Sequence, residues 1–227
     1  MTPLPPEPAG QKRSVFLVDD HPLVREWLTN LINQQPDLVV CGEAESGPQA
    51  MQAILALKPD VAIVDISLKD SSGIELIKDL KQYCSSVAVL VLSMHEELHY
   101  AERALRAGAK GYIMKRETTR KVIIAIRQIM QGGLYMSDNL AAAMAAQFVK
   151  GKTLANHSPV EQLSDRELEV FELLGQGRGT RQIAGTLRVS VKTVQAYCAR
   201  IKEKFNLTSA TELLREAVLW YESTYKT

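Results

Sequence analysis

Residues 15–22 read VFLVDDHP, and this short stretch decides how the first half of the chain folds. Four apolar residues, Val15 to Val18, are followed at once by two adjacent carboxylates, Asp19 and Asp20. A short run of this kind is typical of a strand buried on both faces of a parallel sheet. Two neighbouring like charges are costly unless a cation or a proton offsets them. The stretch therefore predicts a buried strand that ends at a site in need of positive charge.

The same pattern, a short apolar run followed by an amphipathic segment, continues as far as Gly133. The further apolar runs are 38–40, 61–64, 87–92 and 111–114. Helix-period stripes lie between them, and the last, at 122–130, stops at Gly132-Gly133. Strands that alternate with helices in this way form parallel sheets with helices on both faces. We therefore expect residues 14–133 to be an α/β domain with a doubly wound five-stranded parallel sheet.

The chain outside this repeat has a different composition. Residues 1–13, MTPLPPEPAGQKR, contain four prolines and no apolar core, which predicts a disordered tail rather than a secretory signal. Residues 134–160 contain the segment LAAAMAAQFVK, a helix by propensity, and then GKTLANHSP. We expect 134–160 to be a linker helix followed by a flexible linker.

Residues 161–222 show only helical patterns and predict a small all-α domain of four helices. Ser164 and Glu167 form a capping box that opens a helix through Leu174. Thr180 is expected to cap a second helix through Leu187, and Ser190 a third that runs to Phe205. The fourth covers about 210–220.

The charge of the chain is divided unevenly between its two parts. Residues 1–149 carry 15 Lys and Arg against 17 Asp and Glu, whereas residues 150–227 carry 12 against 9. Seven basic residues and one acid lie between Gly175 and Phe205. Such a concentration favours a polyanionic partner, although charge alone leaves a solvated basic face open.

The cysteines and the hydropathy indicate a cytoplasmic protein. Cys41, Cys84 and Cys198 are scattered and match no metal or redox spacing, as in chains from a reducing compartment. No apolar run approaches the roughly 20 residues that span a bilayer. We therefore expect no membrane partner.

Five polar residues follow the predicted strands directly. They are Asp19, Asp20, Asp65, Ser93 and Lys115. Ligands of open α/β sheets bind outside the carboxyl ends of the strands, so these side chains should converge. Three carboxylates in one cleft suit Mg²⁺, and a carboxylate beside Mg²⁺ and an ammonium group can attack a phosphoryl group. Taken alone, Asp20 before His21-Pro22 also fits a helix N-cap.

The third helix of the C-terminal domain has two distinct faces. Its apolar stripe is Val194, Cys198, Ile201 and Phe205. The opposite face carries Lys192, Ala196, Ala199 and Glu203, flanked by Gln195 and Arg200. The preceding helix ends about two residues earlier, which indicates a helix-turn-helix whose second helix enters the major groove of DNA.

Through these strand-end residues, residues 14–131 resemble the receiver domain of two-component response regulators. The resemblance implies that Asp65 is the phosphoacceptor and that Lys115 pairs with the phosphoryl group. It implies that Asp20, Asp65 and the backbone carbonyl of Ser67 bind Mg²⁺, with Asp19 acting through a water molecule. Ser93 and Tyr112 would be the switch residues, which move together when the phosphoryl group binds.

Residues 161–220 resemble the LuxR/FixJ-type helix-turn-helix domain, which implies binding to double-stranded DNA as a homodimer. The residues expected at the DNA are Lys192, Thr193, Gln195, Ala196 and Ala199 in the groove, and Arg200, Lys204 and Arg181 near phosphates.

The sequence thus predicts a transcriptional regulator, not an enzyme, in which phosphorylation of Asp65 by a histidine kinase switches dimerisation or DNA binding. Two alternatives stay open. One is a DNA-binding protein independent of phosphorylation, whose receiver domain serves for dimerisation. The other is a Mg²⁺-dependent aspartyl-phosphate phosphatase, although such enzymes often place a second Asp where this chain has Ser67.

Overall fold

The computed structural model describes residues 12–68, 71–94, 97–117, 119–149 and 159–225. The chain divides into two compact units, residues 1–144 and 145–227, and each is described by itself. Residues 1–11 of the predicted tail and 150–158 of the predicted flexible linker lie outside the described residues. The domain boundaries 14–133, 134–160 and 161–222 stay predictions.

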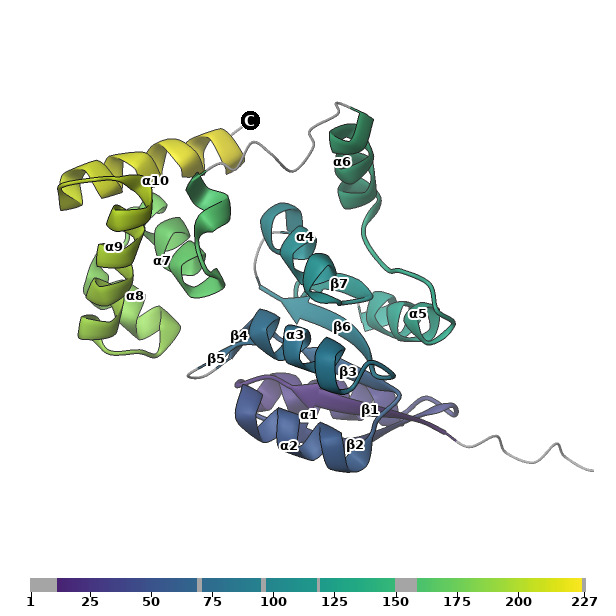
Figure 1. Ribbon diagram of the computed structural model, residues 1–227. Helices are drawn as coiled ribbons and strands as arrows, with labels where there is room; N and C mark the ends of the chain where they lie inside the picture. Colours follow the sequence, from purple (N-terminus) through teal and green to yellow (C-terminus); the bar gives the residue numbers. More distant parts are fainter. Residues whose placement is uncertain (1–11, 69–70, 95–96, 118, 150–158, 226–227) are drawn as a thin grey trace, which may run out of the picture. The chain divides into compact units, whose positions relative to one another are not determined.

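The first unit is built around a five-stranded parallel sheet (Figure 1). Its strands are β1 (Arg13–Val18), β2 (Leu38–Ala44), β3 (Val61–Val64), β6 (Ala88–Ser93) and β7 (Gly111–Met114). Their order in the sheet is β2-β1-β3-β6-β7, and every pair is parallel. The order reverses direction after β1, which creates the switch point of a doubly wound sheet. The predicted fold class is confirmed.

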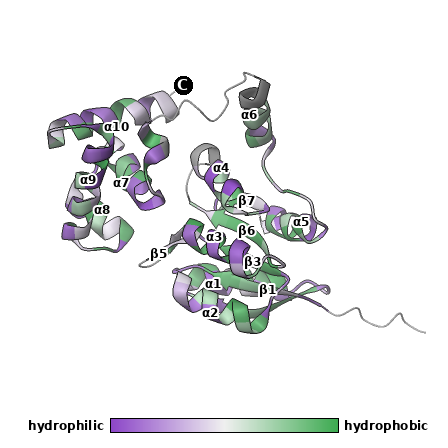
Figure 2. Cartoon of the chain, viewed as in Figure 1, coloured by the Kyte–Doolittle hydropathy of each residue, from purple (hydrophilic) through white to green (hydrophobic). Residues whose placement is uncertain are grey.

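Helices flank both faces of this sheet. They are α1 (Pro22–Asn33), α2 (Gly47–Leu57), α3 (Gly73–Tyr83), α4 (Glu97–Ala107) and α5 (Thr119–Met130). One face packs on α1 and α5, where Leu28, Ile32 and Ile126 join Val15 and Leu17 in a single buried cluster. Figure 2 shows β1, β3 and β6 mainly in the hydrophobic colour, as expected for the buried strands of the sheet.

Two details of the sheet differ from the sequence pattern. The strand β2 continues to Ala44, four residues beyond the predicted run, because it pairs with β1 past a register shift at Val15/Phe16. A two-stranded antiparallel pair, β4 (Ser67–Leu68) with β5 (Ser71–Ser72), follows β3 and was not predicted. Strands of two residues are too short to leave a period in a sequence.

The segment after α5 returns to the outer edge of the sheet. The Tyr135 carbonyl accepts a hydrogen bond from the Tyr112 N–H at 3.1 Å, and the Tyr135 N–H donates to the Lys110 carbonyl at 2.9 Å. Gly111 permits this approach, since an added Cβ would lie 3.0 Å from the Tyr135 carbonyl oxygen. We call this two-bond pairing the Tyr135 latch. The helix α6 (Asp138–Val149) follows and confirms the predicted linker helix.

Residues 159–225 of the second unit form a short 3₁₀ helix and four α-helices. They are η1 (Pro159–Gln162), α7 (Asp165–Gly175), α8 (Thr180–Leu187), α9 (Val191–Phe205) and α10 (Ala210–Tyr225). Phe171 lies fully buried at the centre, with its ring 5.0 Å from that of Phe205 and 5.6 Å from that of Trp220. In neither unit is any helix of the described residues long and apolar enough to cross a membrane.

The caps of these helices match the sequence in two cases out of three. Ser164 accepts from the Glu167 N–H at 3.4 Å while Glu167 accepts from the Ser164 N–H at 2.8 Å, so the capping box is confirmed. The Ser190 hydroxyl accepts from the Thr193 N–H at 3.0 Å, as predicted. Thr180 as a cap is wrong: it is already helical. Gly179 is the cap residue, because Gln182 accepts its N–H at 2.9 Å.

Two helical glycines of the second unit offer a matched test of its packing. An added Cβ on Gly175, at the end of α7, would lie 2.5 Å from the Ala217 carbonyl oxygen of α10, whereas one on Gly185 would meet nothing within 4 Å. We expect Gly175→Ala to destabilise this unit by about 1–3 kcal/mol, because α10 must move. Gly185→Ala should stabilise it by up to about 1 kcal/mol. Thermal unfolding of both variants measures this, and equal effects would contradict the α7–α10 contact.

Candidate functional site

Three carboxylates converge at the carboxyl ends of β1 and β3, as the sequence predicts. Asp19, Asp20 and Asp65 are all buried, at 2%, 9% and 3% exposure. One ligand atom from each, together with one from His21, falls within 4.8 Å of the others. These are the residues that follow the apolar runs directly, so the parallel sheet alone brings them together.

The ammonium group of Lys115 lies between two of these carboxylates. Its Nζ is 2.6 Å from Asp19 Oδ2 and 2.7 Å from Asp65 Oδ2, and its side chain is only 8% exposed. Burial lowers the pKa of Lys115, but the nearby Asp65 and Asp19 charges outweigh burial, and the pKa lies above its ordinary value. Lys115 is therefore a permanent cation, and one cation facing three carboxylates leaves the pocket with an excess of negative charge.

Asp19 is held in place from its own loop. Its Oδ1 accepts the His21 N–H at 2.9 Å, and Arg25 donates to the Asp19 carbonyl at 2.7 Å. The helix α1 begins at Pro22 with His21 as its cap residue and no side-chain cap bond. The interpretation of Asp20 as an N-cap is therefore wrong, and its carboxylate lies in the acidic cluster instead.

His21, the cap residue of α1, is a member of the site that was not among the predicted site residues. Its Nδ1 lies 2.7 Å from Asp20 Oδ1 and 3.1 Å from Asp19 Oδ1, and its side chain is 46% exposed. The signal for it was its position directly after Asp19-Asp20. Its ring lies at the mouth of the pocket, beside two of the three carboxylates.

The loop after β3 is drawn tightly around Asp65. The Ser67 N–H donates to Asp65 Oδ1 at 3.4 Å, and the Gly73 N–H donates to the Ile66 carbonyl at 2.7 Å. An added Cβ on Gly73 would lie 2.0 Å from the Asp65 carbonyl oxygen, so only glycine permits this approach. The start of α3 thus fixes the backbone that carries Asp65.

Ser93 and Tyr112 lie on the two strands at the other side of the pocket. Ser93, the last residue of β6, is fully buried, and its carbonyl accepts the Lys115 N–H at 2.7 Å. Tyr112 lies on β7 at 1% exposure. The two strands are parallel neighbours, with Val91 beside Tyr112 and Ser93 beside Met114. The backbone thus joins Ser93 to Lys115, and the strand of Tyr112 carries Lys115.

The donor set of the pocket is consistent with a metal site. Carboxylate and carbonyl oxygens are hard ligands, and the excess negative charge favours a divalent cation. Asp20 faces the cluster from β1 and Asp65 from β3, so that a cation there would bridge two strands.

In the second unit, α9 presents the expected face to solvent. Val194 and Ile201 are buried against the core. Most residues predicted at DNA are fully or partly exposed: Arg181, Lys192, Thr193, Gln195, Ala196, Ala199 and Arg200. The Ser190 hydroxyl lies 2.8 Å from the Thr193 hydroxyl at the start of the helix. The exposed face is basic and small-sided, as a groove-binding surface requires.

Lys204 has a different environment from the other predicted DNA contacts. Its Nζ lies 2.6 Å from Glu167 Oε2 and donates to the Gln162 carbonyl at 2.9 Å. Glu167 is nearly buried and caps α7 through Ser164. Lys204 therefore joins α9 to the start of α7, and its role at DNA stays a prediction.

Comparison with known proteins matches both parts of the chain. Residues 15–127 match the family described as the response regulator receiver domain, and residues 161–217 match the bacterial regulatory proteins of the luxR family. The oxygen regulatory protein NreC of Staphylococcus epidermidis is 34% identical over 209 residues, which cover 90% of this chain and 96% of that protein. NreC of Staphylococcus carnosus is 33% identical over 208 residues, with the same coverage.

Solved structures show the same folds. A LuxR-family two-component response regulator from Aurantimonas sp. SI85-9A1 is 32% identical, with a TM-score of 0.58, over 61% of this chain and 99% of that one. RcsB of Salmonella enterica serovar Typhimurium, solved on the rprA promoter with a phosphomimetic, is 24% identical with a TM-score of 0.57. That match covers 90% of this chain and 98% of RcsB.

The Glu167–Lys204 pair gives a prediction with a defined pH dependence. Burial raises the pKa of Glu167, but Lys204 and the Ser164 N–H outweigh it, and the pKa lies below its ordinary value. A depressed pKa stabilises the fold above the unfolded-state value, and this stability is lost as the pH falls through the folded-state value. Lys204→Met should therefore cost about 1–3 kcal/mol at neutral pH, with a deficit that shrinks in acid.

The measurement is the free energy of unfolding of the second unit, taken from its denaturant transition at several pH values. Lys202→Met is the matched control, because Lys202 forms no ion pair with any described residue. A deficit that stays constant with pH would show that the pair does not carry the effect.

Proposed function

The chain belongs to the LuxR family of two-component response regulators, and from this membership we propose that Asp65 accepts a phosphoryl group and thereby controls DNA binding by α9. As a member of this family the protein is a transcriptional regulator, not an enzyme. The observation that carries the proposal is the buried contact of Lys115 with Asp19 and Asp65 at the end of the sheet.

The acidic pocket fits Mg²⁺ in particular. Asp20, Asp65 and the backbone carbonyl of Ser67 would hold the ion, with Asp19 acting through a bound water. Bound Mg²⁺ would neutralise charge on the phosphoryl oxygens. Its preference for oxygen ligands, with several waters retained, matches a pocket that offers few protein ligands and opens to solvent at His21.

Phosphoryl transfer requires an oxygen nucleophile and a counter-charge. One carboxylate oxygen of Asp65 forms the new bond to phosphorus while the phosphorus–nitrogen bond of the kinase phosphohistidine breaks, and the electron pair stays on the imidazole. Lys115, already 2.7 Å from Asp65, then pairs with the phosphoryl oxygens. Its raised pKa keeps it charged throughout.

The switch would start from the same contact. When Lys115 turns from Asp65 to the phosphoryl group, the end of β7 and the backbone bond between Lys115 and Ser93 are both affected. The Ser93 hydroxyl would bond a phosphoryl oxygen, and Tyr112 would respond from β7. Ser93 and Tyr112 would have one arrangement without the phosphoryl group and another with it. These arrangements would change dimerisation or DNA binding only as far as they differ in free energy for the active form.

The DNA-binding surface is the exposed face of α9. Its groove-facing residues would be Lys192, Thr193, Gln195, Ala196 and Ala199, with Arg200, Arg181 and Lys204 near phosphates. RcsB, which shares the fold, was solved on promoter DNA, which supports this use of the helix. The chain would act as a cytoplasmic homodimer whose phosphodonor is a histidine kinase.

The phosphorylation proposal predicts a response confined to one aspartate. Acetyl phosphate with Mg²⁺ should phosphorylate the wild-type chain, as measured by intact mass, and beryllofluoride with Mg²⁺ should raise its melting temperature. Asp65→Asn should abolish both, because it removes the nucleophile. Asp79→Asn, an exposed aspartate of α3, is the matched control and should respond like wild type. A full response from Asp65→Asn would reject the assignment.

The DNA proposal predicts a change in salt dependence. Lys192→Ala with Arg200→Ala should weaken binding to every DNA sequence and reduce the slope of log K against log salt by about 1, since Arg200 is the member of the pair placed at a phosphate and each lost phosphate contact removes about one unit. Fluorescence anisotropy at several salt concentrations measures the slope. Lys78→Ala with Arg106→Ala removes the same charge from the first unit and should change neither quantity. An unchanged slope in the α9 variant would reject the surface.

A further inference from the structure

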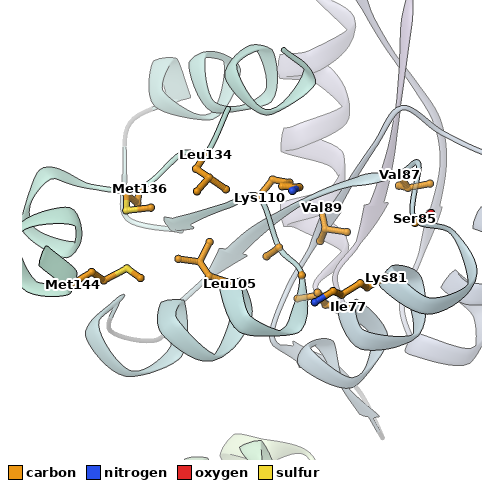
Figure 3. A pocket seen from close by; sticks show the side chains of 12 residues that line it. Ile77, Lys81, Ser85, Val87, Val89, Leu105, Lys110, Leu134, Met136 and Met144 are labelled. Carbon is orange, nitrogen blue, oxygen red and sulfur yellow. The ribbon is translucent and has the colours of Figure 1, made fainter. Parts of the chain in front are cut away.

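A cavity of about 340 Å³ lies in the first unit beneath the chain that follows α5. Its lining comes from α3, α4, the strand β6 with the loop before it, the loop that precedes β7, and Leu134, Met136 and Met144. Figure 3 shows Met144, Met136 and Leu134 toward one end and Ser85 and Lys81 toward the other. The volume is at the lower end of the range of small-molecule sites, about 300–1,000 Å³. It suits a ligand of few atoms.

The two ends of the cavity differ in chemistry. Leu134, Met136 and Met144 offer only aliphatic and thioether surface, and methionine adapts readily to the shape of a ligand. The other end has the hydroxyl of Ser85 and the exposed ammonium group of Lys81, and Lys110 lies between (Figure 3). An elongated ligand with one apolar end and one polar end matches this arrangement.

The charged residues that line the cavity, Lys81 and Lys110, are both basic. Lys81 and Lys110 form no ion pair with any residue that the structure describes, and no described lining residue is an acid. The stem of Lys81 is fixed against Gly108, where an added Cβ would lie 2.8 Å from its Cδ. Two unneutralised cations beside an apolar chamber favour an anionic head group.

A second groove in the same unit is lined by charges of the opposite sign. The groove between α2 and α3 is larger, about 550 Å³, and also mostly apolar. Its charged lining residues are Glu75 and Asp79, with no cation among the described ones. An anion would be repelled there, so the α3–α4 cavity is the better site for one.

The Tyr135 latch forms the cover of the cavity. Leu134 and Met136 flank Tyr135, which is bonded to Lys110 and Tyr112 at the edge of β7. A ligand beneath this segment would contact Leu134 and Met136 on either side of Tyr135, and Leu105 of α4. Its binding would therefore restrict the opening of the two latch hydrogen bonds.

We propose that this cavity binds a small aliphatic monocarboxylate. The hydrocarbon chain lies beneath Leu134, Met136 and Met144, and the carboxylate pairs with Lys81 and Lys110. The cavity is lined by no residue of the acidic pocket, so its ligand can be tested on the unphosphorylated chain without DNA.

Calorimetric titration of the full-length chain with straight-chain carboxylates from acetate to octanoate tests the ligand class. Affinity should rise about fourfold with each added methylene until the cavity is filled, because each buried methylene contributes about 0.8 kcal/mol. 1-Octanol and octylamine, which share the chain but lack the anion, should bind more weakly than octanoate. Affinity independent of chain length, or equal binding of octanol, would overturn the proposal.

Variants locate the site. Lys81→Glu with Lys110→Glu should weaken octanoate binding at least about tenfold, because two attractive pairs become repulsive. Lys78→Glu is the control, since Lys78 lies on the same helix but pairs with Glu75 and does not line the cavity. Octanoate should also slow hydrogen exchange at the amides of Tyr112 and Tyr135. Unchanged affinity in the double variant, or unchanged exchange at both amides, would place the ligand elsewhere and reject the site.

Discussion

The ion pairs of Lys115 with Asp19 and Asp65 are the contacts on which the rest of the first unit depends. Each of these residues ends a different strand, so the pairs exist only if β1, β3 and β7 lie in one parallel sheet. Burial makes the charges sensitive to any added group, because water screens them little. One ammonium group against three carboxylates leaves an imbalance that a divalent cation can correct.

The strand β7 connects this pocket to the rest of the chain. It carries Tyr112 and leads directly into Lys115 at one end, and its outer edge is bonded to Tyr135 where the chain leaves the sheet. A shift of Lys115 therefore has a short path, along a single strand, to the segment that precedes α6. The cavity beneath that segment is closed by the same latch, so a ligand there and a change at Asp65 would act on a shared element.

The second unit relies on a smaller electrostatic contact. Glu167 caps α7 and also accepts from Lys204, so one carboxylate joins the start of α7 to the end of α9. The resemblance to the LuxR/FixJ-type domain implied that Lys204 lies near DNA phosphates. Its partner is 37 residues away in the chain, and no local pattern could reveal that.

The sequence by itself determined the five strands, the helices between them, the capping box at Ser164 and the residues that end each strand. These follow from local period and from the rule that parallel strands align their carboxyl ends. Only the tertiary structure decided two non-local contacts: that Lys204 pairs with Glu167, and that Tyr135 bonds to β7. Each depends on which distant groups meet, because a side chain's partner is fixed by packing between elements and not by its neighbours in sequence.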